Sequence, residues 1–172
     1  MRERRKTLDA GRRSCESRVM TNEYEAPDKR AFPFPDGYEL STDPARLDLC
    51  RIHQWLSQDA YWAIGRTRGK QDASVAGSLN FGVYEEASGT QVGYARVVTD
   101  HATFAFLCDV YIDRSVRGKG LGTALAAGVR DHLAPYGLRR VLLATGDAHG
   151  VYEKVGFTGL DHPEHWMLLG EQ

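Results

Sequence analysis

The stretch VRGKGLGTAL, residues 116–125, places glycines at every second position and cations between them. The five residues concerned are Arg117, Gly118, Lys119, Gly120 and Gly122. Glycine loses more backbone freedom on folding than other residues, so this series favours unusual dihedral angles or a close approach of the backbone to a ligand. The apolar residues that follow indicate a helix start, where free N–H groups and the positive end of the helix dipole attract phosphate. We therefore predict an anion-binding loop, since a turn that only caps a helix does not need paired cations.

The spacing matches neither of two common nucleotide-binding motifs. A GxxxxGK[ST] loop needs Ser or Thr after the lysine, but Lys119 is followed by Gly120, and Asp113 stands where the first glycine would be. A GxGxxG fingerprint needs its third glycine at the position of Thr123. The predicted anion site therefore belongs to neither motif.

Two helices and a loop are predicted around these residues. Apolar residues recur every four positions from Leu121 to Leu133, so the glycine loop opens an amphipathic helix. Pro44, in the first turn of the stretch 42–56, indicates an earlier helix there. Residues 60–77 show no clear period, and we expect a long loop, with room for a short helical turn, of the kind that is usually functional in a compact domain.

Six stretches predict strands, because their apolar residues alternate or run together. They are residues 38–41, 79–83, 90–100, 103–112, 138–144 and 166–169. A further short helix is expected over residues 148–154. A helix and a hairpin followed by alternating strands and helices predict a mixed α/β sheet.

The composition limits the organisation and the partners of the chain. Its 172 residues, 42% hydrophobic, suit one compact domain. The net charge of −1 offers no overall basic field for nucleic acid or an anionic membrane, and no apolar run reaches the ~20 residues of a membrane-spanning helix. Cys15, Cys50 and Cys108 form no CxxC pair, which argues against a disulfide framework or a cysteine zinc site and favours a cytoplasmic location.

Residues 1–36 differ from the rest of the chain. The first twenty are rich in arginine and poor in large apolar residues, which predicts a disordered basic tail; Met20 is an alternative start. Phenylalanine and proline alternate over residues 32–35, which predicts an extended lead-in. We expect the folded domain over residues 37–172.

Three segments resemble the GNAT superfamily of acyl-CoA-dependent N-acetyltransferases. RGKGLG is similar to the R/Q-x-x-G-x-G/A pyrophosphate loop of that family, and DVYIDRSV is similar to the strand that leads into it. DAHGVYEKVGF resembles the short helix, tyrosine and Gly-Phe turn of the family; Tyr152, Gly156 and Phe157 occupy the matching positions. The resemblance covers residues 38–169 and implies a GNAT fold, with about six to seven strands splayed around acetyl-CoA and flanked by helices.

The resemblance also implies roles for single residues. Val110 and Ile112 would hold the pantetheine arm through their backbone groups, as an added strand. The residues that would wrap the pyrophosphate are Arg117, Gly118, Lys119, Gly120, Gly122 and Thr123. Thr145 stands where many relatives carry Asn, and its hydroxyl can still bond the cofactor arm. Tyr152 would be the acid that protonates the departing thiolate. Acetyl-CoA would be a co-substrate, and no metal is expected.

The general base is less well defined, because Cys108 replaces a glutamate that polyamine-type relatives carry. We take Asp109, a carboxylate inside a predicted strand, as the candidate; an ion pair with a core arginine such as Arg96 is the alternative. Cys108 is expected to be a small buried strand residue rather than an acylated nucleophile.

For the acceptor, Tyr61, Trp62 and Phe104 or Phe106 are candidate pocket residues. We expect a small-molecule amine; a protein N-terminus or lysine, and a non-catalytic acyl-CoA-binding module, are the alternatives. We expect a monomer or a homodimer. Among the histidines, His149 is expected to be a solvated helix residue, and His162 with His165 a surface turn rather than a metal site.

Overall fold

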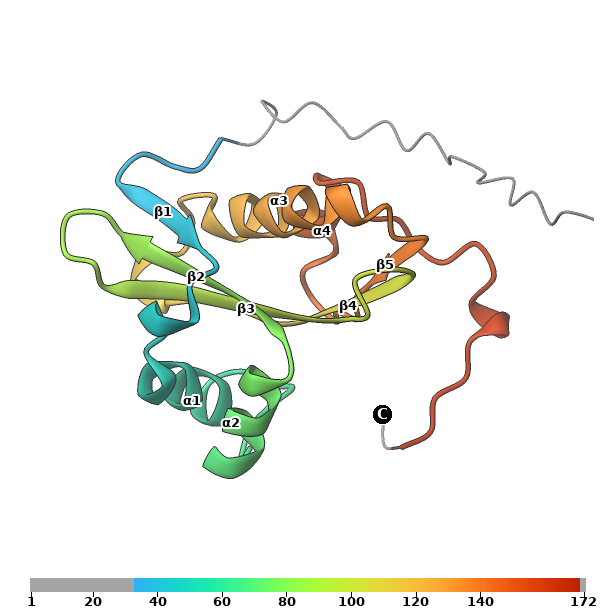
Figure 1. The fold of residues 1–172 in the computed structure, drawn as a ribbon, viewed down its shortest axis with the longest axis horizontal. Coiled ribbons are helices and arrows are strands. Elements are labelled where there is room, and N and C mark those ends of the chain that lie inside the picture. Colours follow the sequence, from blue (N-terminus) through green and yellow to red (C-terminus); the bar gives the residue numbers. More distant parts are fainter. Residues whose placement is uncertain (1–32, 171–172) are drawn as a thin grey trace, which may run out of the picture.

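A five-stranded mixed sheet lies at the centre of the fold, and the computed structural model describes residues 33–170 (Figure 1). Its strands are β1 (Tyr38–Ser41), β2 (Leu79–Glu85), β3 (Gln91–Thr99), β4 (Phe104–Ile112) and β5 (Arg140–Leu142). They lie side by side in this order; every pair is antiparallel except β4 and β5, which are parallel. The predicted mixed α/β class is confirmed, with five strands instead of six to seven. The predicted basic tail lies outside the described residues.

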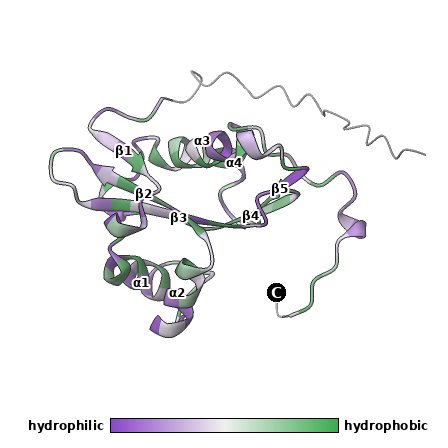
Figure 2. Cartoon of the chain, viewed as in Figure 1, coloured by the Kyte–Doolittle hydropathy of each residue, from purple (hydrophilic) through white to green (hydrophobic). Residues whose placement is uncertain are grey.

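Helices cover both faces of the sheet (Figure 1). They are α1 (Leu49–Gln58) and α2 (Arg68–Ala76) on one face, and α3 (Leu121–Leu133) and α4 (His149–Glu153) on the other. Helix α1 buries Ile52, Trp55 and Leu56 against Tyr94 and Tyr111 of the sheet. The larger core lies under α3, which is coloured mostly apolar in Figure 2. Among the helices of residues 33–170, none has the length and apolar character that a membrane crossing requires.

Two local predictions are wrong. Residues 60–77 are not a continuous loop, because α2 occupies their second half; its only buried residue is Gln71, so the helix has no apolar period to detect. Thr67 still marks its start, since the Thr67 hydroxyl accepts a hydrogen bond from the backbone N–H of Lys70. The predicted strand 166–169 is not formed, and β5 covers only three of the seven residues expected for it.

Strand β4 has a partner strand on both edges only at its start. It pairs with β3 as far as Ile112, but with β5 only over Phe104–Phe106. At Asp109 the backbone is left-handed, with φ +52°, and the register against β3 shifts opposite Ala95. Such a bulge bends the strand and redirects its side chains. The half of β4 after residue 106 therefore has one edge free of β5, and this edge faces the site described below.

Candidate active site

A cavity of about 770 Å³ lies beside the free half of β4. It extends from the glycine loop before α3 to the end of α1 and to the first turn of α4. The sequence-predicted residues that line it are Tyr61, Trp62, Asp109, Val110, Ile112, Arg117, Gly118, Gly120, Gly122, Thr123, Thr145 and Tyr152. The fold thus brings together side chains that are more than ninety positions apart in the sequence.

The glycine loop presents its backbone to the cavity. Gly118 and Gly120 have φ of +81° and +82°, in the left-handed region that favours glycine. A Cβ atom at either position would meet nothing within 4 Å, so these glycines are needed for the backbone conformation and not for packing inside the protein. Helix α3 begins at Leu121, and Gly120 at its N-cap has no side chain to cap it, whereas Asp48 and Thr67 cap α1 and α2. Its first N–H groups are therefore available to an acceptor from outside the chain.

The side chains of the two cationic residues in the loop point in different directions. Arg117 lines the cavity: its Nε donates to the Ile112 carbonyl at 2.9 Å, and its guanidinium lies 5.1 Å from the Tyr111 ring centre. Lys119 does not line it, because its Nζ donates to the Tyr38 hydroxyl at 2.8 Å. In this conformation the side chain of Lys119 is directed to Tyr38 and not to the cavity, and its expected contact with the cofactor stays a prediction.

Asp59, at the end of α1, lines one wall of the cavity. It was not predicted from the sequence. Its carboxylate accepts from the Tyr111 hydroxyl at 2.5 Å and pairs with Arg114, and Arg117 lies 3.5 Å away. Hydrogen bonds from Arg114 and then Tyr111 lower the pKa of Asp59 to about 2. No motif surrounds this aspartate, so only the fold reveals that it positions the arginine of the glycine loop.

Tyr152 lies on the opposite wall, on α4. Its side chain is 9% exposed and packs against Phe157, and burial raises its pKa to about 12, so the phenol is protonated at neutral pH. Within residues 33–170 its hydroxyl has no hydrogen-bond partner. Nearby, the Thr145 hydroxyl accepts from the N–H of Ala148 at 3.1 Å and retains its own proton for donation.

Asp109 is held by two arginines. Its carboxylate accepts two hydrogen bonds from Arg66, at 2.6 and 3.0 Å, one from Arg96 at 2.6 Å and one from Trp62 at 3.3 Å. Burial alone would raise the pKa of Asp109, but the hydrogen bonds from Arg66 and Arg96 outweigh it and lower the pKa below its usual value. A carboxylate held ionised in this way is a poor proton acceptor. The geometry favours the ion-pair alternative over the general base.

Aromatic side chains stand at the mouth of the cavity. Tyr61 and Trp62 are exposed and meet edge to face, with ring centres 4.9 Å apart. The Tyr61 hydroxyl accepts from the N–H of Gly146 at 3.2 Å and lies 3.5 Å from a carboxylate oxygen of Asp147, which links two loops across the mouth. Phe104 lies outside the cavity at the start of β4, so it is not a pocket residue; Phe106, two positions later, lines it.

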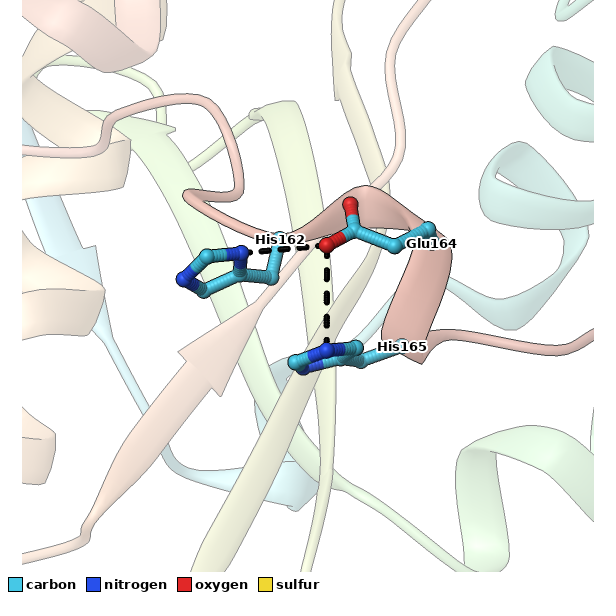
Figure 3. Close-up of side chains that lie close together, drawn as sticks. All are labelled: His162, Glu164 and His165. Carbon is cyan, nitrogen blue, oxygen red and sulfur yellow. Dashed lines mark hydrogen bonds and ion pairs between the residues drawn. The ribbon is translucent and has the colours of Figure 1, made fainter.

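The remaining candidates do not form part of an obvious catalytic group. Cys108 is half-buried in β4, and burial raises the pKa of its thiol, which favours the unreactive protonated form. His149 is exposed at the start of α4. His162, Glu164 and His165 meet in an exposed turn away from the cavity, where Glu164 contacts both imidazoles (Figure 3). The expectation that no metal binds there stays a prediction.

Comparison with known proteins gives consistent results. The model of the Acetyltransferase (GNAT) family matches residues 37–157. A protein of Gibberella zeae, FG08082, whose name proposes an acetyltransferase, is 34% identical, and the match covers 68% of this chain and 76% of that one. A crystal structure from Xanthomonas campestris, described as belonging to the GNAT family, is 40% identical with a TM-score of 0.74, and the match covers 81% of this chain and 95% of that one.

One further structure shares the fold at low identity. Rv2747 from Mycobacterium tuberculosis, solved in complex with CoA, is 17% identical with a TM-score of 0.60, and the match covers 72% of this chain and 73% of that one. At this identity the likeness concerns the fold alone.

Proposed function

This chain belongs to the GNAT acetyltransferase family, and we propose that it transfers an acetyl group from acetyl-CoA to the amine of a small molecule. One observation carries the proposal: a single cavity connects the uncapped glycine loop, the free edge of β4, the buried phenol of Tyr152 and an aromatic mouth. An acyl-transfer site needs an anion cradle, backbone donors beside the reacting carbonyl and a proton donor for the leaving group. This cavity contains a candidate for each.

The residues present fit the co-substrate. Gly118 and Gly120 leave open the space that a side chain would fill, and Arg117 adds positive charge where a pyrophosphate would lie. Val110 and Ile112 line the cavity on the half of β4 that has no β5 partner, so an extended arm can lie along that edge. Acetyl-CoA supplies an activated thioester when it is bound there, and we assign the proton of its departing sulfur to the Tyr152 hydroxyl.

The residues at the mouth of the cavity favour a small amine as the acceptor. The contact of Tyr61 with Gly146 and Asp147 bridges the opening, which leaves less room for a protein segment than for a small molecule. The faces of Tyr61 and Trp62 attract an ammonium group, and Asp147, which forms no ion pair within residues 33–170, adds negative charge beside them. Because Asp109 is held by two arginines, we propose that the amine loses its proton to water at this mouth, next to Asp147.

Turnover with a panel of acceptors tests the function. Purified protein with acetyl-CoA is expected to release the free thiol of CoA faster with small primary amines than without an acceptor, and mass spectrometry is expected to find the acetylated amine. Faster acetylation of peptides carrying a free N-terminus or lysine would favour a protein substrate. Binding of acetyl-CoA without thiol release from any acceptor would favour the non-catalytic module.

Substitution in the glycine loop tests the co-substrate site. Gly120→Ala is expected to weaken CoA binding by about tenfold, or about 1.4 kcal/mol, because the methyl group enters the cradle. Gly137→Ala is the matched control: Gly137 also has a positive φ and open space around its Cβ, but it follows the far end of α3. Both variants carry a similar backbone strain. Equal CoA affinity in the two variants, measured by titration calorimetry, would contradict the site.

A further inference from the structure

The side chains around Asp109 hold more positive charge than its carboxylate can balance. Arg66 and Arg96 both pair with it at 2.6 Å, so two guanidinium groups and one carboxylate leave a single surplus positive charge. The side chains of the two arginines are mostly buried. A buried cation is costly to desolvate, and one arginine is enough to neutralise one carboxylate. The second arginine therefore needs a reason outside this ion pair.

The carboxylate of Asp109 has no capacity left for a further donor. Its Oδ2 accepts from Nη1 of Arg66 and from Nε of Arg96. Its Oδ1 accepts from Nη2 of Arg66 and from the indole N–H of Trp62. Each oxygen thus accepts two hydrogen bonds, which matches its two lone pairs. The remaining N–H groups of the two arginines must find another acceptor.

Arg96 keeps donors that are open to the cavity. Its Nη1 reaches the Ser78 hydroxyl at 3.4 Å, and its Nη2 has no acceptor in the part of the chain that the structure describes. This nitrogen is not fully buried, since the buried side-chain atoms without a partner in that part are Gln71 Nε2 and the Tyr84 hydroxyl. Arg96 lines the cavity and Arg66 does not, so the open guanidinium edge is that of Arg96.

Apolar and aromatic groups surround this edge. Phe106 and Cys108 of β4 line the cavity together with Arg96, and Cys108 lies opposite Arg96 in the register of β3 and β4. Trp62 donates to Asp109 at 3.3 Å, so the aromatic mouth begins directly beside the arginine. A charged hydrogen bond is stronger in such surroundings than in water. An anion that enters the cavity therefore gains most at this point.

The other two arginines that line the cavity are already assigned. Arg114 pairs with Asp59, and Arg117 belongs to the glycine loop that we assign to the pyrophosphate. Arg96 is therefore the lining arginine that remains for the acceptor.

We propose that the acceptor carries a carboxylate as well as its amine, and that Arg96 binds this carboxylate. The assignment rests on the proposed function and narrows its substrate class to amino acids and related amino carboxylates. A guanidinium edge matches a carboxylate in shape and charge, and one surplus positive charge fits a monoanion better than a doubly charged phosphate. Asp147 lines the cavity 3.5 Å from the Tyr61 hydroxyl, so side chains of opposite charge flank the aromatic mouth, as a zwitterion requires.

Matched pairs of acceptors test the substrate class. Glycine, L-leucine, β-alanine and γ-aminobutyrate are each compared with their amides, which keep the size and the amine and remove the negative charge. The best carboxylate is expected to exceed its amide at least about tenfold in kcat/KM, since a hydrogen bond to a charged group contributes that much. Equal values within every pair, or a higher value for O-phosphoethanolamine than for every carboxylate, would overturn the proposal.

Substitution of Arg96 tests the residue. Arg96→Gln is expected to raise the KM of the preferred carboxylate about tenfold and to leave the KM of its amide within about twofold, because only the charged group loses its partner. Arg96→Lys keeps the charge and should keep part of the preference. Arg68→Gln is the matched control, since Arg68 pairs with Asp72 on the exposed surface of α2, and it should change neither KM. An equal rise for both acceptors in folded Arg96→Gln would mean that Arg96 supports the fold alone, and the proposal would be wrong.

Binding to the wild-type protein separates this proposal from the proposed function and does not depend on a variant that folds. The same pairs are titrated by calorimetry into the protein with CoA bound, where no acetyl group is available for transfer. We expect a carboxylate to bind more tightly than its amide even if no acceptor is turned over; absence of turnover alone would count against the proposed function. Equal or undetectable binding within every pair would contradict the carboxylate site.

Discussion

Replacing Asp109 by asparagine is expected to lower the free energy of unfolding by about 3 kcal/mol at pH 7. The substitution leaves Arg66 and Arg96 facing an uncharged amide, while the side chains of the two arginines are only 18% and 15% exposed. Removal of one partner from a buried ion pair costs more than the pair contributes, because the remaining charges stay desolvated. Urea denaturation followed by circular dichroism measures the change.

Asp72→Asn is the matched control for Asp109→Asn. Asp72 forms an ion pair with Arg68 at 2.7 Å, but this pair lies on the exposed surface of α2. Its loss is expected to cost less than about 0.5 kcal/mol, since exposed pairs of this spacing contribute little. Equal effects of the two substitutions would contradict the role that we give to the buried pair.

The pH dependence of the same two proteins gives an independent check. The pKa of Asp109 is lower in the folded protein than the ~3.9 of an unfolded chain, so folding stabilises its ionised form. This contribution is complete above pH ~4 and is lost as the pH falls through the folded pKa. We therefore expect the stability difference between wild type and Asp109→Asn to shrink below pH ~4. A constant difference down to pH 2 would contradict the assignment.

Activity of the Asp109→Asn variant separates positioning from base catalysis. As a positioning residue, Asp109 holds Arg66 and Trp62 of the loop before α2, so its loss should raise the KM for the acceptor as well as lower the stability. As a general base, its loss would abolish kcat in a protein of normal stability. The second pattern would restore the base role that the sequence suggested.

The residues proposed for the co-substrate can be read from the sequence more directly than the walls of the cavity that join distant elements. The glycine loop and Tyr152 belong to continuous segments whose local structure is set by glycine conformation and helix periodicity, and these properties can be read along the chain. The wall formed by Asp59, Arg114 and Tyr111 joins α1 to β4 across more than fifty positions. No local pattern contains information on such a contact.

The incorrect predictions have similar physical causes. Helix α2 was missed because it is mostly exposed and depends on capping by Thr67 more than on an apolar face. The resemblance places Lys119 in the loop that would wrap the pyrophosphate; its side chain reaches the hydroxyl of Tyr38 in this conformation, so that role stays a prediction. The segment 166–169 has the residues of a strand, but it pairs with no other strand within residues 33–170. In each of these cases, the outcome depends on a partner that sequence periodicity does not specify.

Replacing Tyr152 by phenylalanine is expected to lower turnover by about 10²-fold or more and to leave CoA affinity unchanged. The pKa of the phenol, about 12, lies well above the ~8.5 of a free thiol, so under the proposed function Tyr152 would stay protonated and donate a hydrogen bond that stabilises the departing sulfur. Donors with a better leaving thiol should be less affected, because they depend less on this proton.

The alternative is that Tyr152 only anchors α4. Since its hydroxyl has no partner within residues 33–170, we expect Tyr152→Phe to change the free energy of unfolding by less than about 0.5 kcal/mol. Tyr94→Phe is the matched control: the buried Tyr94 hydroxyl donates to Asn80 at 2.6 Å and lies away from the cavity, so its loss should cost about 1 kcal/mol and leave turnover per folded molecule intact. Stability and turnover measured on the same preparations separate the two roles. If Tyr152 only anchors α4, Tyr152→Phe should lower stability and keep turnover, as expected for Tyr94→Phe. If Tyr152 is the proton donor, Tyr152→Phe should lower turnover and keep stability.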